Sequence, residues 1–119
     1  MKKLVLLLLV LFSLFSFAKK VNIVILETSD LHGRLFSYDY AIDQVDSSAG
    51  LTKVATIIKE ERAKNKNLIL ADNGDTVQDN NAELFNSMPI HPMIQGLNDL
   101  KYDFWTLGNH EFNFEKEFL

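Results

Sequence analysis

Three short apolar runs, each followed by a cluster of Gly, Asp, Asn and His, constrain what this chain can fold into. The runs are residues 21–28, 68–71 and 102–107, and the clusters are Asp30-Leu31-His32, Gly74-Asp75 and Gly108-Asn109-His110-Glu111. Runs rich in β-branched and aromatic residues with few polar interruptions predict strands of a parallel sheet, the first of them a central strand covered on both faces. Because the carboxyl ends of parallel strands share one edge, the clusters are expected at the edge where α/β proteins bind ligands.

The segments between these runs contain helical signals. From Leu51 the apolar positions share one helical face until Asn-Lys-Asn at 65–67, and Pro92 suits the first turn of a helix that ends near residue 100. Residues 80–86 could form a short helix, and residues 29–48 read as a long polar loop. The order strand, helix, strand, helix, strand predicts an α/β fold with a mostly parallel sheet.

Charge and length limit the possible functions. The 119 residues have room for one small domain. The net charge of −4 argues against broad binding to a nucleic-acid polymer, which relies on clustered Lys and Arg. An acidic chain can still bind a phosphate substrate, because bound metal ions invert the local field.

The N-terminus has the features of a secretory signal peptide. Lys2 and Lys3 precede an apolar stretch at 4–17, and small residues lie at the positions that a signal peptidase reads. We expect residues 1–18 to be removed after Ala18 and the protein to be periplasmic or extracellular. The stretch of roughly 14 apolar residues is shorter than the ~20 of a spanning helix, so no stable membrane anchor is expected after cleavage. The chain has no Cys, so disulfides do not accompany export.

The other end predicts a truncated chain. Residues 114–119 read as the start of a helix that has no cap or breaker before the sequence ends. We therefore expect residues 19–119 to be the N-terminal part of a larger catalytic domain.

Asp30 and His32 are candidate ligands of one divalent ion. If strand geometry continues past Thr28, residues two apart point the same way and Leu31 between them faces the core. The alternative is an Asp–His hydrogen bond within a loop.

Asp75 is the candidate bridge between two ions. A carboxylate can span metals ~3.5–4 Å apart, whereas the alternative is an Asx turn. Asp72, three residues earlier, is expected to bond locally or to support the ligands.

The third cluster has the most specific pattern. Gly108 permits a tight turn, Asn109 offers a neutral amide oxygen to a metal, and Glu111 could support the loop. His110 would project elsewhere and suits proton transfer rather than ligation. The alternative is a capped turn with a surface His.

The ordered pattern D-x-H, G-D, G-N-H-E resembles the calcineurin-like metallophosphoesterase superfamily, and within it the secreted 5′-nucleotidase and 2′,3′-cyclic-nucleotide 2′-phosphodiesterase branch. The resemblance implies the N-terminal part of a four-layer α/β/β/α sandwich with two divalent metal ions, which the ligand types allow to be Mn, Fe, Co or Zn. It assigns metal ligation to Asp30, His32, Asp75 and Asn109, and protonation of the leaving group to His110. The family's further His ligands lie downstream and are not in this sequence, so the chain by itself is expected to bind metal poorly and to be inactive.

The expected reaction is hydrolysis of nucleotide phosphoesters in nucleotide catabolism, with a metal-activated water as the nucleophile. In 5′-nucleotidases of this type an Asp pairs with the catalytic His three residues later, and here that position is Asn113. The run Gly-Asn-His-Glu-Phe-Asn is more similar to the cyclic-nucleotide members, so cyclic or 3′-nucleotides are expected as well as, or instead of, 5′-nucleotides.

Other functions remain open at this point. The chain could act on a non-nucleotide ester, or it could be a non-catalytic exported remnant or binding module. Substrate-binding residues are unknown. Phe36, Tyr38 and Tyr40 either line the cleft or simply pack, and Arg34 either contacts phosphate or is a solvated loop residue. His91 is expected to begin a helix.

Overall fold

The structure is a computed structural model, and it describes residue 2 and residues 19–118. The leader expected at residues 1–18 lies outside the described residues apart from Lys2. Within the part of the chain that the structure describes, no helix is both long enough and apolar enough to cross a membrane.

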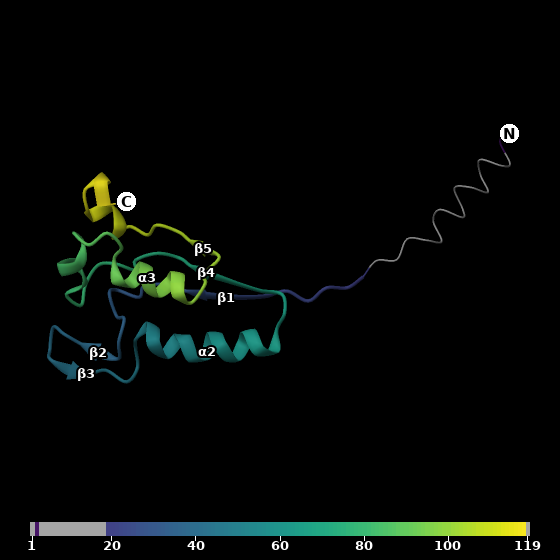
Figure 1. Cartoon of the computed structure of the whole chain (residues 1–119), viewed down its shortest axis with the longest axis horizontal. Helices are drawn as coiled ribbons and strands as arrows, with labels where there is room; N and C mark the ends of the chain where they lie inside the picture. Colours follow the sequence, from purple (N-terminus) through teal and green to yellow (C-terminus); the bar gives the residue numbers. More distant parts are fainter. Residues whose placement is uncertain (1, 3–18, 119) are drawn as a thin grey trace.

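A three-stranded parallel sheet with two α-helices packed on one face forms the body of the molecule (Figure 1). The strands lie in the order β1, β4, β5, where β1 is Val24–Thr28, β4 is Leu68–Asp72 and β5 is Phe104–Trp105. The helices are α2 at Leu51–Lys64 and α3 at Pro92–Asp99. The predicted α/β class and the parallel pairing are confirmed.

Short elements complete the chain. A small antiparallel hairpin joins β2 at Tyr38–Asp39 to β3 at Gln44–Val45. Three 3₁₀ turns follow: η1 at Ala82–Phe85, η2 at Glu111–Asn113 and η3 at Lys116–Phe118.

Both helices form where the sequence predicted them. Helix α2 begins after Gly50 and ends at Lys64, with Asn65 as its C-cap. Its last turn carries Arg62 and Lys64, whose positive charges interact favourably with the negative end of the helix dipole. Helix α3 has Pro92 in its first turn, where the missing N–H has no helical partner to lose.

The core lies between the helices and the sheet. Leu51 of α2 and Met93 and Leu97 of α3 are almost fully buried, and Leu31 and Trp105 pack against them. The prediction that Leu31 faces the core is therefore confirmed.

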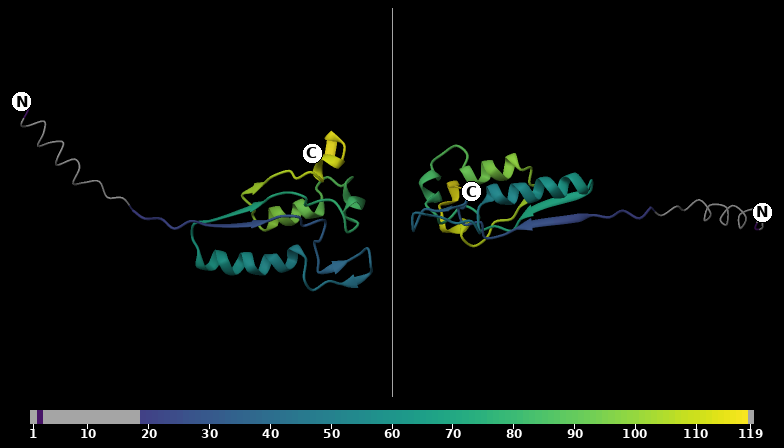
Figure 2. Two further views of the ribbon diagram at one scale, coloured as in Figure 1. Left: turned by 180° about the vertical axis from the view of Figure 1, so that it is seen from behind. Right: turned by 90° about the horizontal axis from the view of Figure 1, so that it is seen from below.

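The expected two-sided cover of the first strand is wrong for the described residues. Strand β1 is at an edge, and both helices pack on the same side of the sheet, as the right-hand view of Figure 2 shows. On the other face Ile25 is 66% exposed and Phe104 of β5 is 63% exposed. Strand β5 is also shorter than the predicted 102–107, at two residues.

Two further sequence expectations differ from the structure. The segment 29–48 contains the β2–β3 hairpin rather than a continuous loop, because Arg34 donates to both Asp39 and Asp46 at 2.8 Å. The side-chain hydrogen bond from Arg34 lowers the pKa of Asp39. Near the C-terminus, residues 116–118 form a 3₁₀ turn instead of the start of an α-helix.

Candidate metal centre

The loops after β1 and β4 run side by side beyond the ends of the strands. Three backbone hydrogen bonds link them: Asp30 N–H to Gly74 O at 3.0 Å, His32 N–H to Asp75 O at 2.9 Å, and Gly33 N–H to Thr76 O at 2.9 Å. These bonds bring the first two polar clusters to the same edge of the sheet.

The strand-like alternation expected for Asp30 and His32 is wrong. Both residues have left-handed backbone conformations, with φ of 56° and 45°, so β1 ends before them. Asp and His tolerate this region better than most residues. Their side chains nevertheless lie close, because His32 Nε2 is 3.7 Å from Asp30 Oδ1.

Three side chains from the three clusters converge. His32, Asp75 and His110 each offer one ligand atom, and these atoms lie within 4.8 Å of one another. Metal–nitrogen and metal–oxygen bonds of about 2.0–2.2 Å place ligands on opposite sides of one ion about 4.4 Å apart and neighbouring ligands closer together, so the three atoms would have to move toward one another to bind a single ion. All three residues are half-buried.

The hydrogen bonding of the His32 ring is also consistent with metal binding. Its Nδ1 atom is buried and makes no hydrogen bond within the described residues, although Asp79 Oδ2 lies 3.0 Å away. Because an unpartnered buried polar group is costly, this ring nitrogen would gain from a metal ion or another partner.

The sequence led us to expect that His110 projects away from the other candidates, and this is wrong. Its ring lies edge-on to that of His32, with the ring centroids 5.1 Å apart. Its backbone N–H donates to Asp75 Oδ1 at 2.9 Å, which fixes the turn after β5 against the turn after β4. Asn109, between Gly108 and His110, has an exposed side chain.

Two glycines let these turns meet. A Cβ on Gly74 would lie 2.2 Å from the backbone nitrogen of Gly108, and a Cβ on Gly108 would lie 2.3 Å from Asp75 Oδ1. No side chain fits in either place, so the close approach of the turns requires glycine.

Two buried carboxylates accept hydrogen bonds from the turns that carry the centre. Asp72 is fully buried and accepts hydrogen bonds from Thr28 Oγ1 at 2.5 Å, Thr76 Oγ1 at 2.6 Å and the N–H of Gly74 at 3.0 Å. It therefore bonds locally, as predicted for it.

Glu111 is the second buried carboxylate. It accepts four backbone N–H groups: those of Asp75 at 2.9 Å, Thr76 at 2.7 Å, Val77 at 3.3 Å and Gly108 at 2.8 Å. Burial raises the pKa of Glu111, but the four hydrogen bonds lower it further than burial raises it, and the net shift is downward. The carboxylate thus joins two of the three clusters.

The sequence analysis missed Gln78 and Asp79. Gln78 Oε1 lies 2.7 Å from His110 Nδ1, and Asp79 Oδ2 lies 3.0 Å from His32 Nδ1. The only hint in the sequence is their position just beyond the Gly74-Asp75 turn. Asn113, which stands where the 5′-nucleotidase pattern has Asp, donates from Nδ2 to Gln78 Oε1 at 2.8 Å.

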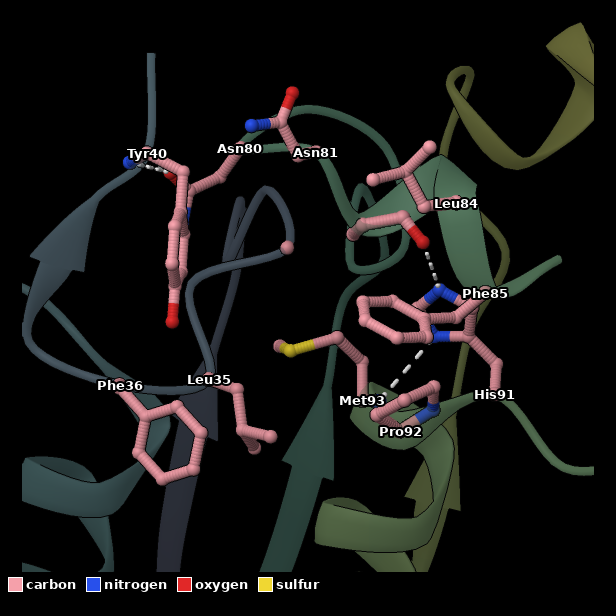
Figure 3. Close-up of a pocket in the computed structure, with 12 residues that line it drawn as sticks. Leu35, Phe36, Tyr40, Asn80, Asn81, Leu84, Phe85, His91, Pro92 and Met93 are labelled. Atoms are coloured by element: carbon pink, nitrogen blue, oxygen red, sulfur yellow. Dashed lines mark hydrogen bonds between the residues drawn. The ribbon is translucent and has the colours of Figure 1, made fainter. Parts of the chain in front are cut away.

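An apolar cavity of about 410 Å³ borders Gly33, the residue after His32, and is lined by none of the converging side chains (Figure 3). Phe36 and Tyr40 are among its lining residues, together with Phe85 and Met93, and Asn80 at its rim accepts from the N–H of Tyr40. A second hollow, also of about 410 Å³, is bordered by Asp30, His32 and Asp79 and, from the side of the hairpin, by Arg34 and Asp39.

His91 begins helix α3, as predicted. Its Nδ1 accepts the N–H of Met93 at 3.2 Å and its Nε2 is 3.0 Å from the carbonyl oxygen of Ala82 (Figure 3). It is buried and takes no part in the metal centre.

Comparisons with known proteins identify the family of the chain. The calcineurin-like phosphoesterase family matches residues 23–119. The chain is 39% identical over 114 residues to the trifunctional nucleotide phosphoesterase protein YfkN of Bacillus subtilis, covering 87% of this chain and 8% of that protein. It is 36% identical to the 2′,3′-cyclic-nucleotide 2′-phosphodiesterase/3′-nucleotidase of Salmonella typhimurium, covering 86% of this chain and 17% of the relative.

A venom enzyme and a solved structure extend the comparison. The chain is 34% identical to the snake venom 5′-nucleotidase of Crotalus adamanteus, covering 81% of this chain and 16% of that protein. The crystal structure of the calcineurin-like phosphoesterase YfkN superimposes with a TM-score of 0.72 at 39% identity, covering 81% of this chain and 32% of that one. The chain thus spans less than a fifth of the curated relatives that it matches.

Proposed function

The chain belongs to the calcineurin-like phosphoesterase family, and on that premise we propose that the protein containing it is a metal-dependent hydrolase of nucleotide phosphoesters. The observation that carries the proposal is the convergence of two assigned metal ligands, His32 and Asp75, with the assigned proton donor His110: one nitrogen or oxygen atom of each lies within 4.8 Å of the others. The names of the relatives, which include nucleotidases and a cyclic-nucleotide phosphodiesterase, support nucleotides as the substrate class.

We assign Asp30 and His32 to one metal ion, Asp75 to the bridge between two ions, and Asn109 to the second ion. Imidazole, carboxylate and amide ligands suit Mn, Fe, Co or Zn. Such ions would activate a water molecule and offset the charge of the phosphate.

His110 is assigned as the proton donor. Attack of water on phosphorus forms one phosphorus–oxygen bond and breaks the ester bond, and the departing alkoxide takes the proton from His110. The support for this assignment is the hydrogen bond from the backbone N–H of His110 to Asp75 Oδ1, which holds the two residues side by side. Glu111 and Asn113 are assigned supporting roles through their hydrogen bonds to the neighbouring turns.

The preferred substrates are proposed to be 2′,3′-cyclic nucleotides and 3′-nucleotides, with 5′-nucleotides as a further class. The support is the uncharged Asn113 where the 5′-nucleotidase pattern has Asp, together with the relative named for both cyclic and 3′ activities. The reaction would serve nucleotide catabolism outside the cytoplasm.

The described residues are proposed to be the N-terminal part of the catalytic domain. The short span of the relatives that the chain covers supports this division. Residues 19–119 alone are expected to bind metal weakly and to show no turnover, because the remaining His ligands would come from elsewhere in the domain.

The test measures product release by the full-length protein from 2′,3′-cyclic AMP, 3′-AMP and 5′-AMP. The protein is first stripped of metal with a chelator and then reloaded with Mn²⁺. Turnover of the cyclic ester that depends on the added metal would support the proposal. Negligible cleavage of the cyclic ester, with 5′-AMP hydrolysed, would reject the cyclic preference.

Variants test the assigned roles. His110→Ala should reduce turnover while metal content stays nearly unchanged, whereas His91→Asn, a control at a histidine outside the centre, should leave turnover intact. Loss of metal in the first variant would show that His110 is a ligand. If no nucleotide is hydrolysed but a sugar phosphate is, the ester class is wrong; if no ester is hydrolysed, a non-catalytic role replaces the enzyme.

A further inference from the structure

One side chain that the proposed mechanism does not use lies directly against its proton donor. We propose that Gln78 is the positioning residue of His110: its amide oxygen holds the Nδ1–H of the imidazole and thereby leaves Nε2 as the ring nitrogen available for proton transfer. The inference rests on the proposed function, in which His110 protonates the leaving group.

The contacts around Nδ1 identify Gln78 as the partner. Gln78 Oε1 lies 2.7 Å from His110 Nδ1, and Asn113 Nδ2 donates to the same oxygen at 2.8 Å. An amide oxygen can only accept, so the ring nitrogen facing it carries the hydrogen. Asn113 Nδ2 also lies 3.2 Å from Nδ1 and would donate to that nitrogen in the other tautomer, but the Gln78 contact is the shorter of the two and requires the hydrogen on Nδ1.

Asn113 therefore acts on His110 through Gln78. Its NH₂ fixes the orientation of the Gln78 amide, with the oxygen toward the ring, and the two hydrogen bonds at that oxygen agree with each other. The sequence pattern around His110 does not indicate this role for Gln78, because Gln78 is 32 positions away.

The backbone on both sides of Gln78 is held in place. The N–H of Val77 donates to Glu111 Oε1 at 3.3 Å, and the N–H of Asp79 donates to Glu83 Oε1 at 2.7 Å. The backbone of His110 is in turn bonded to Asp75. With both partners anchored, the Gln78–His110 hydrogen bond sets the direction of the ring.

The chemical consequence is a fixed tautomer. With Nδ1–H bonded to Gln78, the neutral ring presents its lone pair at Nε2, and the protonated ring presents Nε2–H as the donor. Gln78 satisfies Nδ1–H in both forms, so the ring need not turn when the proton is transferred. Partners of the distal ring nitrogen commonly fix tautomer and orientation in this way at metal sites.

The test compares three variants of the full-length protein loaded with Zn²⁺. Gln78→Leu removes the acceptor, Gln78→Glu keeps an acceptor oxygen at the same place, and Gln95→Leu is the matched control. Gln95 is an exposed glutamine on α3 that bonds to Asp99, away from the centre. The readouts are the nitrogen NMR shifts of the His110 ring, identified by their loss in His110→Ala, and kcat and KM for the cyclic nucleotide.

We expect wild type and Gln95→Leu to show the Nδ1–H tautomer. Gln78→Leu should lose it, with kcat reduced roughly tenfold and KM changed less than about twofold, since supporting partners of this kind typically contribute 10–100-fold. Gln78→Glu should recover most of both signals. A tautomer unchanged in Gln78→Leu, or a Glu variant no better than Leu, overturns the proposal.

Separate controls distinguish a folding defect in the variant from a failure of the proposed function. If Gln78→Leu unfolds, Gln78→Met replaces it, because its unbranched side chain has nearly the same length without the amide. If the wild-type protein hydrolyses no phosphoester, the proposed function fails, while the NMR comparison still decides whether Gln78 holds Nδ1–H.

Discussion

The N–H of Thr76 donates to Glu111 Oε1 at 2.7 Å across 35 positions of the sequence. The same carboxylate accepts the N–H groups of Asp75, Val77 and Gly108, so it joins the turn after β4 to the turn after β5. The bridge is buried and charged, which makes it sensitive to substitution and to pH.

We expect Glu111→Gln to destabilise the protein by about 2 kcal/mol, because an amide can accept with only one of its two polar atoms and leaves buried N–H groups unsatisfied. Urea unfolding measures the change in free energy. The matched control is Glu115→Gln, which alters an exposed carboxylate. Equal losses in the two variants would show that the bridge contributes nothing of its own.

Acidification should lower the free energy of unfolding by protonating the Glu111 carboxylate. The net downward pKa shift of Glu111 means that the folded state holds the proton less tightly than the unfolded chain. Its contribution is therefore present above the ordinary glutamate pKa of about 4.3 and is lost as the pH falls through the lower folded value. Unfolding free energies between neutral pH and pH about 3 should fall less steeply in Glu111→Gln than in wild type.

His91 should produce a separate effect nearer neutrality. Burial lowers its pKa, so the unfolded chain binds the proton more tightly and stability declines as the pH falls below the ordinary histidine value of about 6.5. His91→Asn retains a helix cap for Met93 and should flatten the pH dependence of the unfolding free energy in that range. His91→Ala should in addition cost about 1 kcal/mol from the lost cap. An unchanged pH slope in both variants would contradict the role given to His91.

Gly33→Ala should disturb the loop that carries Gln78 and Asp79. The backbone at Gly33 has φ of 66°, and an added Cβ would lie 2.3 Å from the carbonyl oxygen of Asp79. We expect a loss of at least about 1 kcal/mol in thermal or urea unfolding. Gly96→Ala is the comparison, because its Cβ meets the flexible end of Leu51 and helix propensity favours Ala by about 1 kcal/mol. A larger loss at Gly96 would reverse this argument.

We expect the signal peptide to be cleaved during export. If residues 1–18 are a signal peptide, N-terminal sequencing of the protein recovered from the periplasm or the medium will begin at Lys19. Replacing Ala18 with Arg should block processing, because the peptidase requires a small residue there. Recovery of the uncleaved chain from the membrane in wild type would instead favour an anchor.

Much of the fold could be predicted from the sequence because its signals are local. The apolar periodicity from Leu51 and the Pro92 start placed both helices, and the apolar runs placed β1 and β4. The hairpin at β2 and β3 could not be placed in this way, since its strands have two residues each and Arg34 is bonded to Asp39 of β2 and to Asp46 just after β3, which no apolar pattern indicates.

The sequence by itself determined which side chains were available for chemistry: two aspartates, two histidines and an asparagine at the ends of three strand-like runs. Only the tertiary structure decided how they meet. Asp30 and His32 lie close to each other through left-handed turns rather than through strand alternation, and Gln78 reaches His110 from a loop. The physical reason is that hydrophobic periodicity specifies local elements, whereas contacts between turns depend on backbone φ values and hydrogen bonds between distant segments.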